Sequence, residues 1–285
     1  GKYPVILLHG NSCSAVSKEC GWDRTSNWLL EQGYSKAHIW APSYLGFDGD
    51  VSVHGSSHGG GGNVYSNHIS DVKNFINAVL EYTQSDKVHI IGHSAGATMA
   101  RLYALGYENN YDKKARGPNT FSCYPDNTLE FNWSKNNLDK IGTIVLIAGD
   151  NYGFKRSPYS FAKQCEFSAA ENPDGELHKR MNEMWSTKIN EIKSKIKVYA
   201  IIATGGYVDE NSGNSPCGSQ SCLDQADENK FFDMPSLIEE PWNSVTGNAS
   251  NNWHVYIANY RPVFDYYVSK FNEEPNYSIT VDYGM

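Results

Sequence analysis

The sequence predicts an α/β fold in which a mostly parallel β-sheet is covered by helices on both faces. Two observations support it: short apolar runs rich in β-branched residues alternate with segments of helical periodicity, and no internal repeat interrupts this alternation. The chain has 285 residues, 40% of them hydrophobic, so it is long enough to bury a full core. We expect one domain over residues 1–285.

The expected strands and helices alternate along the chain. Short apolar runs predict strands at residues 5–8, 37–40, 88–91, 143–148 and 198–203. Helical patterns predict helices at residues 25–32, 66–83, 95–107, 177–195 and 255–270. In the second helix, apolar residues three and four positions apart form one buried stripe of Ile69, Val72, Phe75, Ile76, Val79 and Leu80.

Two segments interrupt this alternation. Residues 109–140 and 217–250 are rich in Asn, Ser, Pro and aromatic residues, and they are too long for simple connections. We expect them to form cap-like insertions over a functional site.

Charge and hydropathy exclude several classes of partner. The formal net charge is −8 with only 24 Lys and Arg residues, so nucleic acid is not an expected partner. No apolar run approaches the roughly 18–20 residues of a membrane span, so we expect no transmembrane segment. The first ten residues are typical of a strand that enters a loop, which predicts a mature form without a signal peptide. We expect a monomer.

Six cysteines predict disulfide bonds and therefore a secreted, extracellular protein. The close pairs are Cys13 with Cys20 and Cys217 with Cys222, which leaves Cys123 with Cys165. Six cysteines allow 15 connectivities, so the pairing stays open at this point.

The strongest local signal is Gly-His-Ser-Ala-Gly at residues 92–96, between the predicted strand 88–91 and the predicted helix 95–107. A serine on a tight turn from strand to helix is exposed above a sheet, and the helix N-terminus stabilises developing negative charge. The pattern predicts that Ser94 is a nucleophile.

A serine hydroxyl needs a base to remove its proton, and in this arrangement the order along the chain is serine, acid, histidine. Two histidines, His178 and His254, follow Ser94. His178 lies in a charged helical run, where we expect a solvated surface residue, whereas His254 lies just before the last predicted helix. We therefore expect His254 to be the base.

An acid that orients the base is expected after a late strand. Asp209 follows the predicted strand 198–203 and is the first choice, and Asp150, after the strand 143–148, is the alternative acid. An oxyanion needs two backbone donors, which we expect to be the amides of Ala95 and Asn11. His9 precedes Asn11 and is expected to be structural.

These motifs together resemble the lipases and esterases of the α/β-hydrolase superfamily. Within it, the chain is similar to extracellular polyhydroxybutyrate depolymerases built like small bacterial lipases, on the His-Gly-Asn of residues 9–11, the Gly-His-Ser-Ala-Gly motif, the turn at residues 204–210 and the late histidine. The resemblance implies the α/β-hydrolase fold and a serine carboxylester hydrolase that acts through a Ser94–His254–Asp209 triad and an acyl-enzyme. It implies no cofactor.

The substrate class stays open among lipids, small esters and polyesters. The aromatic residues Tyr44 and Trp253 fall in loops near the inferred site and are candidate substrate-binding residues. Alternative functions are an amidase or peptidase on the same triad, and a non-catalytic homologue that binds lipid or polymer.

A metal site is not expected. The histidines at 54, 58 and 68 match no compact ligand pattern.

Overall fold

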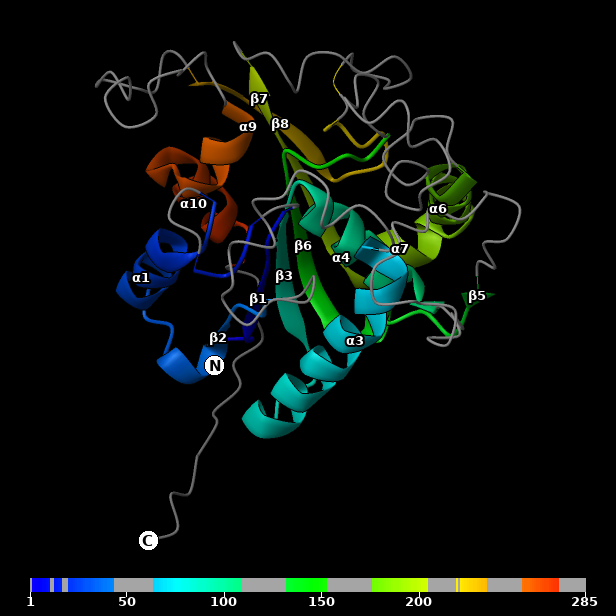
Figure 1. The fold of residues 1–285 in the computed structure, drawn as a ribbon, viewed down its shortest axis with the longest axis horizontal. Coiled ribbons are helices and arrows are strands. Elements are labelled where there is room, and N and C mark those ends of the chain that lie inside the picture. The colour runs from blue at the N-terminus through cyan, green and yellow to red at the C-terminus, as the bar shows by residue number, and fades with distance from the viewer. Residues whose placement is uncertain are drawn as a thin grey trace, which may run out of the picture.

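The computed structural model describes residues 2–10, 13–16, 20–43, 64–108, 132–152, 176–204, 219, 221–234 and 253–271 (Figure 1). Within them, six strands form one sheet in the order β2-β1-β3-β6-β7-β8, and every neighbouring pair is parallel. The strands of this sheet are β1 (Val5–Leu8), β2 (Ile39–Trp40), β3 (Val88–His93), β6 (Ile141–Ile147), β7 (Lys197–Thr204) and β8 (Glu228–Asp233).

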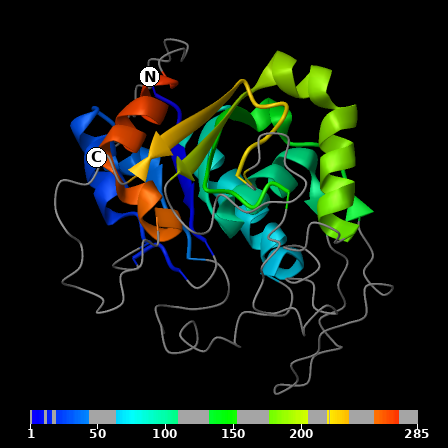
Figure 2. The ribbon, with the colours of Figure 1, turned by 90° about the horizontal axis from the view of Figure 1, so that it is seen from above.

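The helices lie in two layers on opposite faces of this sheet (Figures 1 and 2). Successive strand residues point to opposite faces, so Ile6 and Leu8 pack in one core and Val5 and Leu7 in the other. The first core contains residues from α3 (Val64–Thr83), α4 (Ala95–Leu105), α6 (Glu176–Thr187) and α7 (Ile189–Lys195). The second contains residues from α1 (Asp23–Glu31) and α10 (Arg261–Ser269).

The remaining elements are short. Strands β4 (Tyr107–Glu108) and β5 (Asn132–Trp133) form a small antiparallel pair, α9 (Trp253–Tyr256) is one turn, and 3₁₀ helices occupy Lys36–His38, Leu138–Lys140 and Ile257–Asn259. No helix in the described part of the chain has both the length and the apolar character needed to cross a membrane.

The predicted fold class is confirmed, and three of the predicted elements differ from the structure by more than a shift of one or two residues. The predicted strand 37–40 is a 3₁₀ turn followed by only two strand residues. The predicted helix 177–195 is two helices, α6 and α7, that meet at Lys188. The predicted helix 255–270 is divided before α10, because Pro262 has no amide hydrogen and therefore favours the first turn of a new helix.

The predicted insertions are partly described. Residues 109–131 and 235–250 lie outside the described residues. Within the segment 217–250, Glu228–Asp233 pairs with β7 and extends the central sheet by one strand.

Candidate active site

The candidate site lies where the parallel strands end. Leu8 of β1 pairs with Gly92 of β3, and His93 pairs with Ile147 of β6, so the segments that follow these three strands meet at one edge of the sheet. Ligands of open parallel α/β sheets bind at this edge, outside the carboxyl ends of the strands.

Ser94 occupies a strained turn between β3 and α4. Its φ is 53° and its ψ is −125°, a conformation that non-glycine residues rarely adopt. The flanking glycines allow this turn to form in a crowded place: a Cβ on Gly92 would lie 2.5 Å from the carbonyl carbon of Gly96, and a Cβ on Gly96 would collide with the carbonyl oxygen of Leu8. The turn therefore depends on both glycines of the motif.

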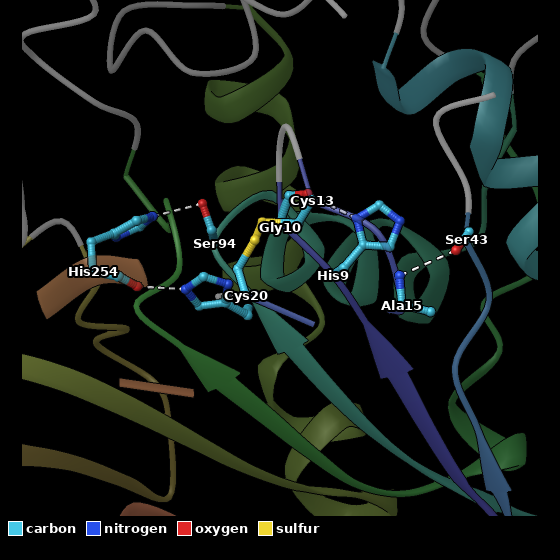
Figure 3. Close-up of a disulfide and its surroundings, with 9 residues drawn as sticks. His9, Gly10, Cys13, Ala15, Cys20, Ser43, Ser94 and His254 are labelled. Carbon is cyan, nitrogen blue, oxygen red and sulfur yellow. Dashed lines mark hydrogen bonds between the residues drawn. A yellow bond between two sulfur atoms is a disulfide. The ribbon is translucent and has the colours of Figure 1, made fainter. Parts of the chain in front are cut away.

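The structure brings His254 to Ser94, although 160 residues separate them. His254 Nε2 lies 2.8 Å from Ser94 Oγ, which is hydrogen-bond distance (Figure 3). Ser94 is 8% exposed and His254 is partly exposed, so the pair is partly accessible to solvent. This is the geometry that a nucleophile and its general base require.

His93, the residue before the serine, also contacts His254. The two rings are tilted by 43° with their centroids 5.2 Å apart, and His93 Nε2 lies 2.6 Å from the backbone oxygen of His254. Burial and, to a smaller extent, the neighbouring His254 lower the pKa of His93 to about 3. His93 is therefore neutral near pH 7.

The loop after β1 is held close to Ser94. A Cβ placed on Gly10 would lie 2.9 Å from Ser94 Cβ, which shows how near the loop passes. His9 is buried, and its Nδ1–H donates to the Gly10 oxygen at 2.8 Å, in agreement with the structural role predicted for it. The predicted Cys13–Cys20 disulfide is present and closes the same loop (Figure 3). Cys222 is also disulfide-bonded, and its partner lies outside the described residues, as do Cys123, Cys165 and Cys217.

One of the two predicted oxyanion donors lies in the described residues. Ala95 is the first residue of α4, and an amide at this position has no acceptor within its own helix. The amide of Ser94 is not available, because it donates to the Ile147 oxygen at 2.9 Å. Asn11 lies outside the described residues.

One of the two candidate acids, Asp150, lies in the described residues. Asp150 is 4% exposed just after β6, and its backbone oxygen accepts a hydrogen bond from His178 Nε2. Asp209, which follows β7, lies outside the described residues. Of the candidate substrate-binding residues, Tyr44 also lies outside them, and Trp253 is the first residue of α9, without a described side chain.

The prediction that His178 is a solvated surface residue is wrong. It is fully buried, and burial together with the nearby Arg101 guanidinium lowers its pKa to about 3. The spacing of His178, Met181 and Trp185 along α6 is the helical signal that places all three on the buried face.

A buried arginine, Arg101, lies beside His178 and was not predicted from the sequence. Arg101 is fully buried and donates to the backbone oxygen of Asn151 at 3.0 Å and to Asn182 Oδ1 at 2.7 Å. Its guanidinium lies 4.8 Å from the Trp185 ring. Burial lowers its pKa to about 10, so it is charged near pH 7. This network fixes the segment that follows β6.

Among the described residues, no group of three or more His, Cys, Asp or Glu side chains is arranged to hold a metal ion. His54, His58 and the side chain of His68 lie outside the described part of the chain.

Comparison with solved structures shows the fold. A mature lipase of Bacillus licheniformis, BlEst2, superposes with a TM-score of 0.50 at 10% identity, over 95% of this chain and 92% of that one. Its propeptide form gives the same TM-score and identity over 98% of this chain and 52% of that one. Phospholipase PlaB of Legionella pneumophila matches at 12% identity and a TM-score of 0.42. The match covers 70% of this chain but only 37% of that longer protein.

Comparison of sequences shows the family. No curated protein matches the chain significantly. The sequence model of the family described as lipase (class 2) matches residues 2–234, which is most of the chain and includes Ser94 but not His254. The matching family model is described as lipase, and the solved structures show the fold alone. The chain belongs to the class 2 lipase family and has the α/β-hydrolase fold.

Proposed function

We propose that the chain is a serine carboxylester hydrolase with Ser94 as nucleophile and His254 as general base. The observation that supports it best is the 2.8 Å distance from His254 Nε2 to Ser94 Oγ at the strained turn before α4. In a non-catalytic homologue nothing would require this distance or the strain at Ser94.

The proposed reaction is a two-step acyl transfer. His254 takes the Ser94 proton as the oxygen attacks the ester carbonyl, and the resulting imidazolium protonates the leaving alcohol as the C–O bond breaks. Water then repeats the sequence on the acyl-enzyme and releases the carboxylic acid. The amides of Ala95 and Asn11 are the proposed donors to the oxyanion. Asp209 is the proposed acid that orients the imidazole, with Asp150 as the alternative.

We also propose that the protein is a secreted monomer, and the Cys13–Cys20 disulfide supports an oxidising compartment. The substrate is proposed to be a lipid, a small ester or a polyester, with Tyr44 and Trp253 as contacts. Similarity to polyhydroxybutyrate depolymerases stays a prediction.

The test is hydrolysis of p-nitrophenyl esters of increasing chain length, a matched p-nitroanilide and a polyhydroxybutyrate film. Ser94→Ala and His254→Ala are each expected to lower kcat by roughly 10⁴-fold or more. Asp209→Asn should lower kcat by a comparable factor and Asp150→Asn should not; the reverse result would make Asp150 the acid. Asp265→Asn, an exposed carboxylate on α10, is the control.

The rates of ester and anilide cleavage distinguish the proposed function from its alternatives. Faster cleavage of the anilide than of the ester would indicate an amidase or peptidase. Ester hydrolysis by Ser94→Ala at the wild-type rate, or none by the wild type, would refute the proposal.

A further inference from the structure

His93 makes a hydrogen bond whose direction is determined by chemistry. Its Nε2 lies 2.6 Å from the backbone oxygen of His254, and a carbonyl oxygen only accepts, so Nε2 carries the hydrogen. His93 is 1% exposed, and its Nδ1 has no hydrogen-bond partner among the described residues. A neutral ring with its hydrogen on Nε2 satisfies this arrangement.

This hydrogen bond is the last link in a ring of contacts that joins His93, Ser94 and His254. His93 and Ser94 are joined by a peptide bond, and Ser94 Oγ lies 2.8 Å from His254 Nε2. The backbone oxygen of His254 in turn accepts the hydrogen bond from His93 Nε2. Residue 254 is therefore held at two points, by its side chain and by its main chain.

The element that carries His254 is short. α9 has only four residues, and a single helical turn is unstable on its own. β3 lies between β1 and β6 in the sheet and is a rigid support. The ring of His93 also fills the space beside the loop after β1, since a Cβ on Gly10 would lie 3.2 Å from its Nδ1.

We propose that His93 is a positioning residue: its Nε2–H holds the main chain of His254 so that the imidazole stays within reach of Ser94. The inference rests on the proposed function, because it assigns His93 a role through the proposed base. His93 itself moves no proton, since its Nε2–H donates to a carbonyl oxygen and its buried Nδ1 has no hydrogen-bond partner among the described residues.

The first test compares two variants of similar size. His93→Met removes the donor, whereas His93→Gln keeps an N–H that can reach the carbonyl. A displacement of about 1 Å at a catalytic group lowers rates by about 10²-fold, so His93→Met should lower kcat by about this factor with KM near the wild-type value. His93→Gln should recover most of the loss.

His89→Leu is the matched control. His89 lies on the same strand, is 2% exposed and stacks on Phe271 at 4.1 Å, roughly 13 Å from His93 along the strand. This variant should lower the melting temperature without changing kcat of the folded enzyme.

A double-mutant cycle separates positioning from general loss of structure. In a His254→Ala background the base is absent, so His93→Met should cause no further loss of the residual activity. An equal loss in both backgrounds would overturn the inference, as would a His93→Gln variant no more active than His93→Met. If instead Ser94→Ala or His254→Ala stays active, the proposed function itself fails.

The protonation of the His93 ring can be measured directly in the wild type. Nitrogen NMR of the histidine rings should show His93 as a neutral imidazole protonated on Nε2 at pH 7. A protonated Nδ1 with a bare Nε2 would overturn the inference.

Discussion

Acidification should destabilise the fold through two buried histidines. Burial is the main cause that lowers the pKa of both His93 and His178 to about 3, and His254 and Arg101, respectively, are the second cause. In the unfolded chain their pKa is about 6.5, so between these values the unfolded state binds more protons than the folded state. The stabilisation is complete above about pH 6.5 and is lost as the pH falls toward the folded-state pKa.

The size of this effect follows from proton linkage. From pH 7 to pH 5, each histidine lowers the free energy of unfolding by about 2 kcal/mol, so the pair contributes about 4 kcal/mol. Domains have total stabilities of about 5–15 kcal/mol, so this loss is a large part of the total.

Urea unfolding at pH 7, 6 and 5, followed by circular dichroism, measures this loss. In His93→Gln and in His178→Gln, the pH-dependent loss should be smaller by about 2 kcal/mol than in the wild type, because glutamine does not titrate. Only the change with pH is compared, since each variant also changes stability at pH 7. Equal losses in the wild type and in both variants would refute the argument.

Two further predictions concern the loop after β1. Gly10→Ala places a Cβ 2.9 Å from Ser94 Cβ, so it should displace the Ser94 side chain and lower kcat by about 10-fold or more. Steady-state kinetics measure kcat, and a wild-type value in this variant would contradict the prediction. Replacing Cys13 and Cys20 by serine should lower the free energy of unfolding by about 2.5 kcal/mol, because the disulfide closes a short loop with a sequence separation of 7. Urea unfolding checks this, and a variant as stable as the oxidised wild type would show that the disulfide contributes nothing.

The strands were predictable where they are buried on both faces. β1 has the predicted bounds, and β3, β6 and β7 each begin and end within two residues of them, because central parallel strands are apolar throughout. β8 was not predicted, since its sequence Glu-Asn-Lys-Phe-Phe-Asp is largely polar. Its place at the edge of the sheet explains this composition and is set by pairing with β7, which local sequence does not show.

The site was predictable where a motif has a fixed backbone context. The glycines around Ser94 and the position of His254 before the last helices were enough to name a pair that the structure places 2.8 Å apart. His178 was misjudged because its charged neighbours in sequence, Lys179 and Arg180, lie on the exposed face of α6 while His178 faces the core. The contact of His93 with His254 joins residues far apart in the chain, and no local pattern encodes it.

The proposed nucleophile and the proposed base lie on parts of the fold that differ in local stability. Ser94 follows an interior strand of the sheet, whereas His254 lies in a single helical turn. Interior strands exchange their amide hydrogens mainly through global unfolding, while short elements open at a smaller free energy. Brief openings of α9 therefore separate His254 from Ser94 while the sheet stays intact. Since the proposed reaction needs both groups in contact, we expect molecules with α9 open to be inactive and their fraction to rise with temperature.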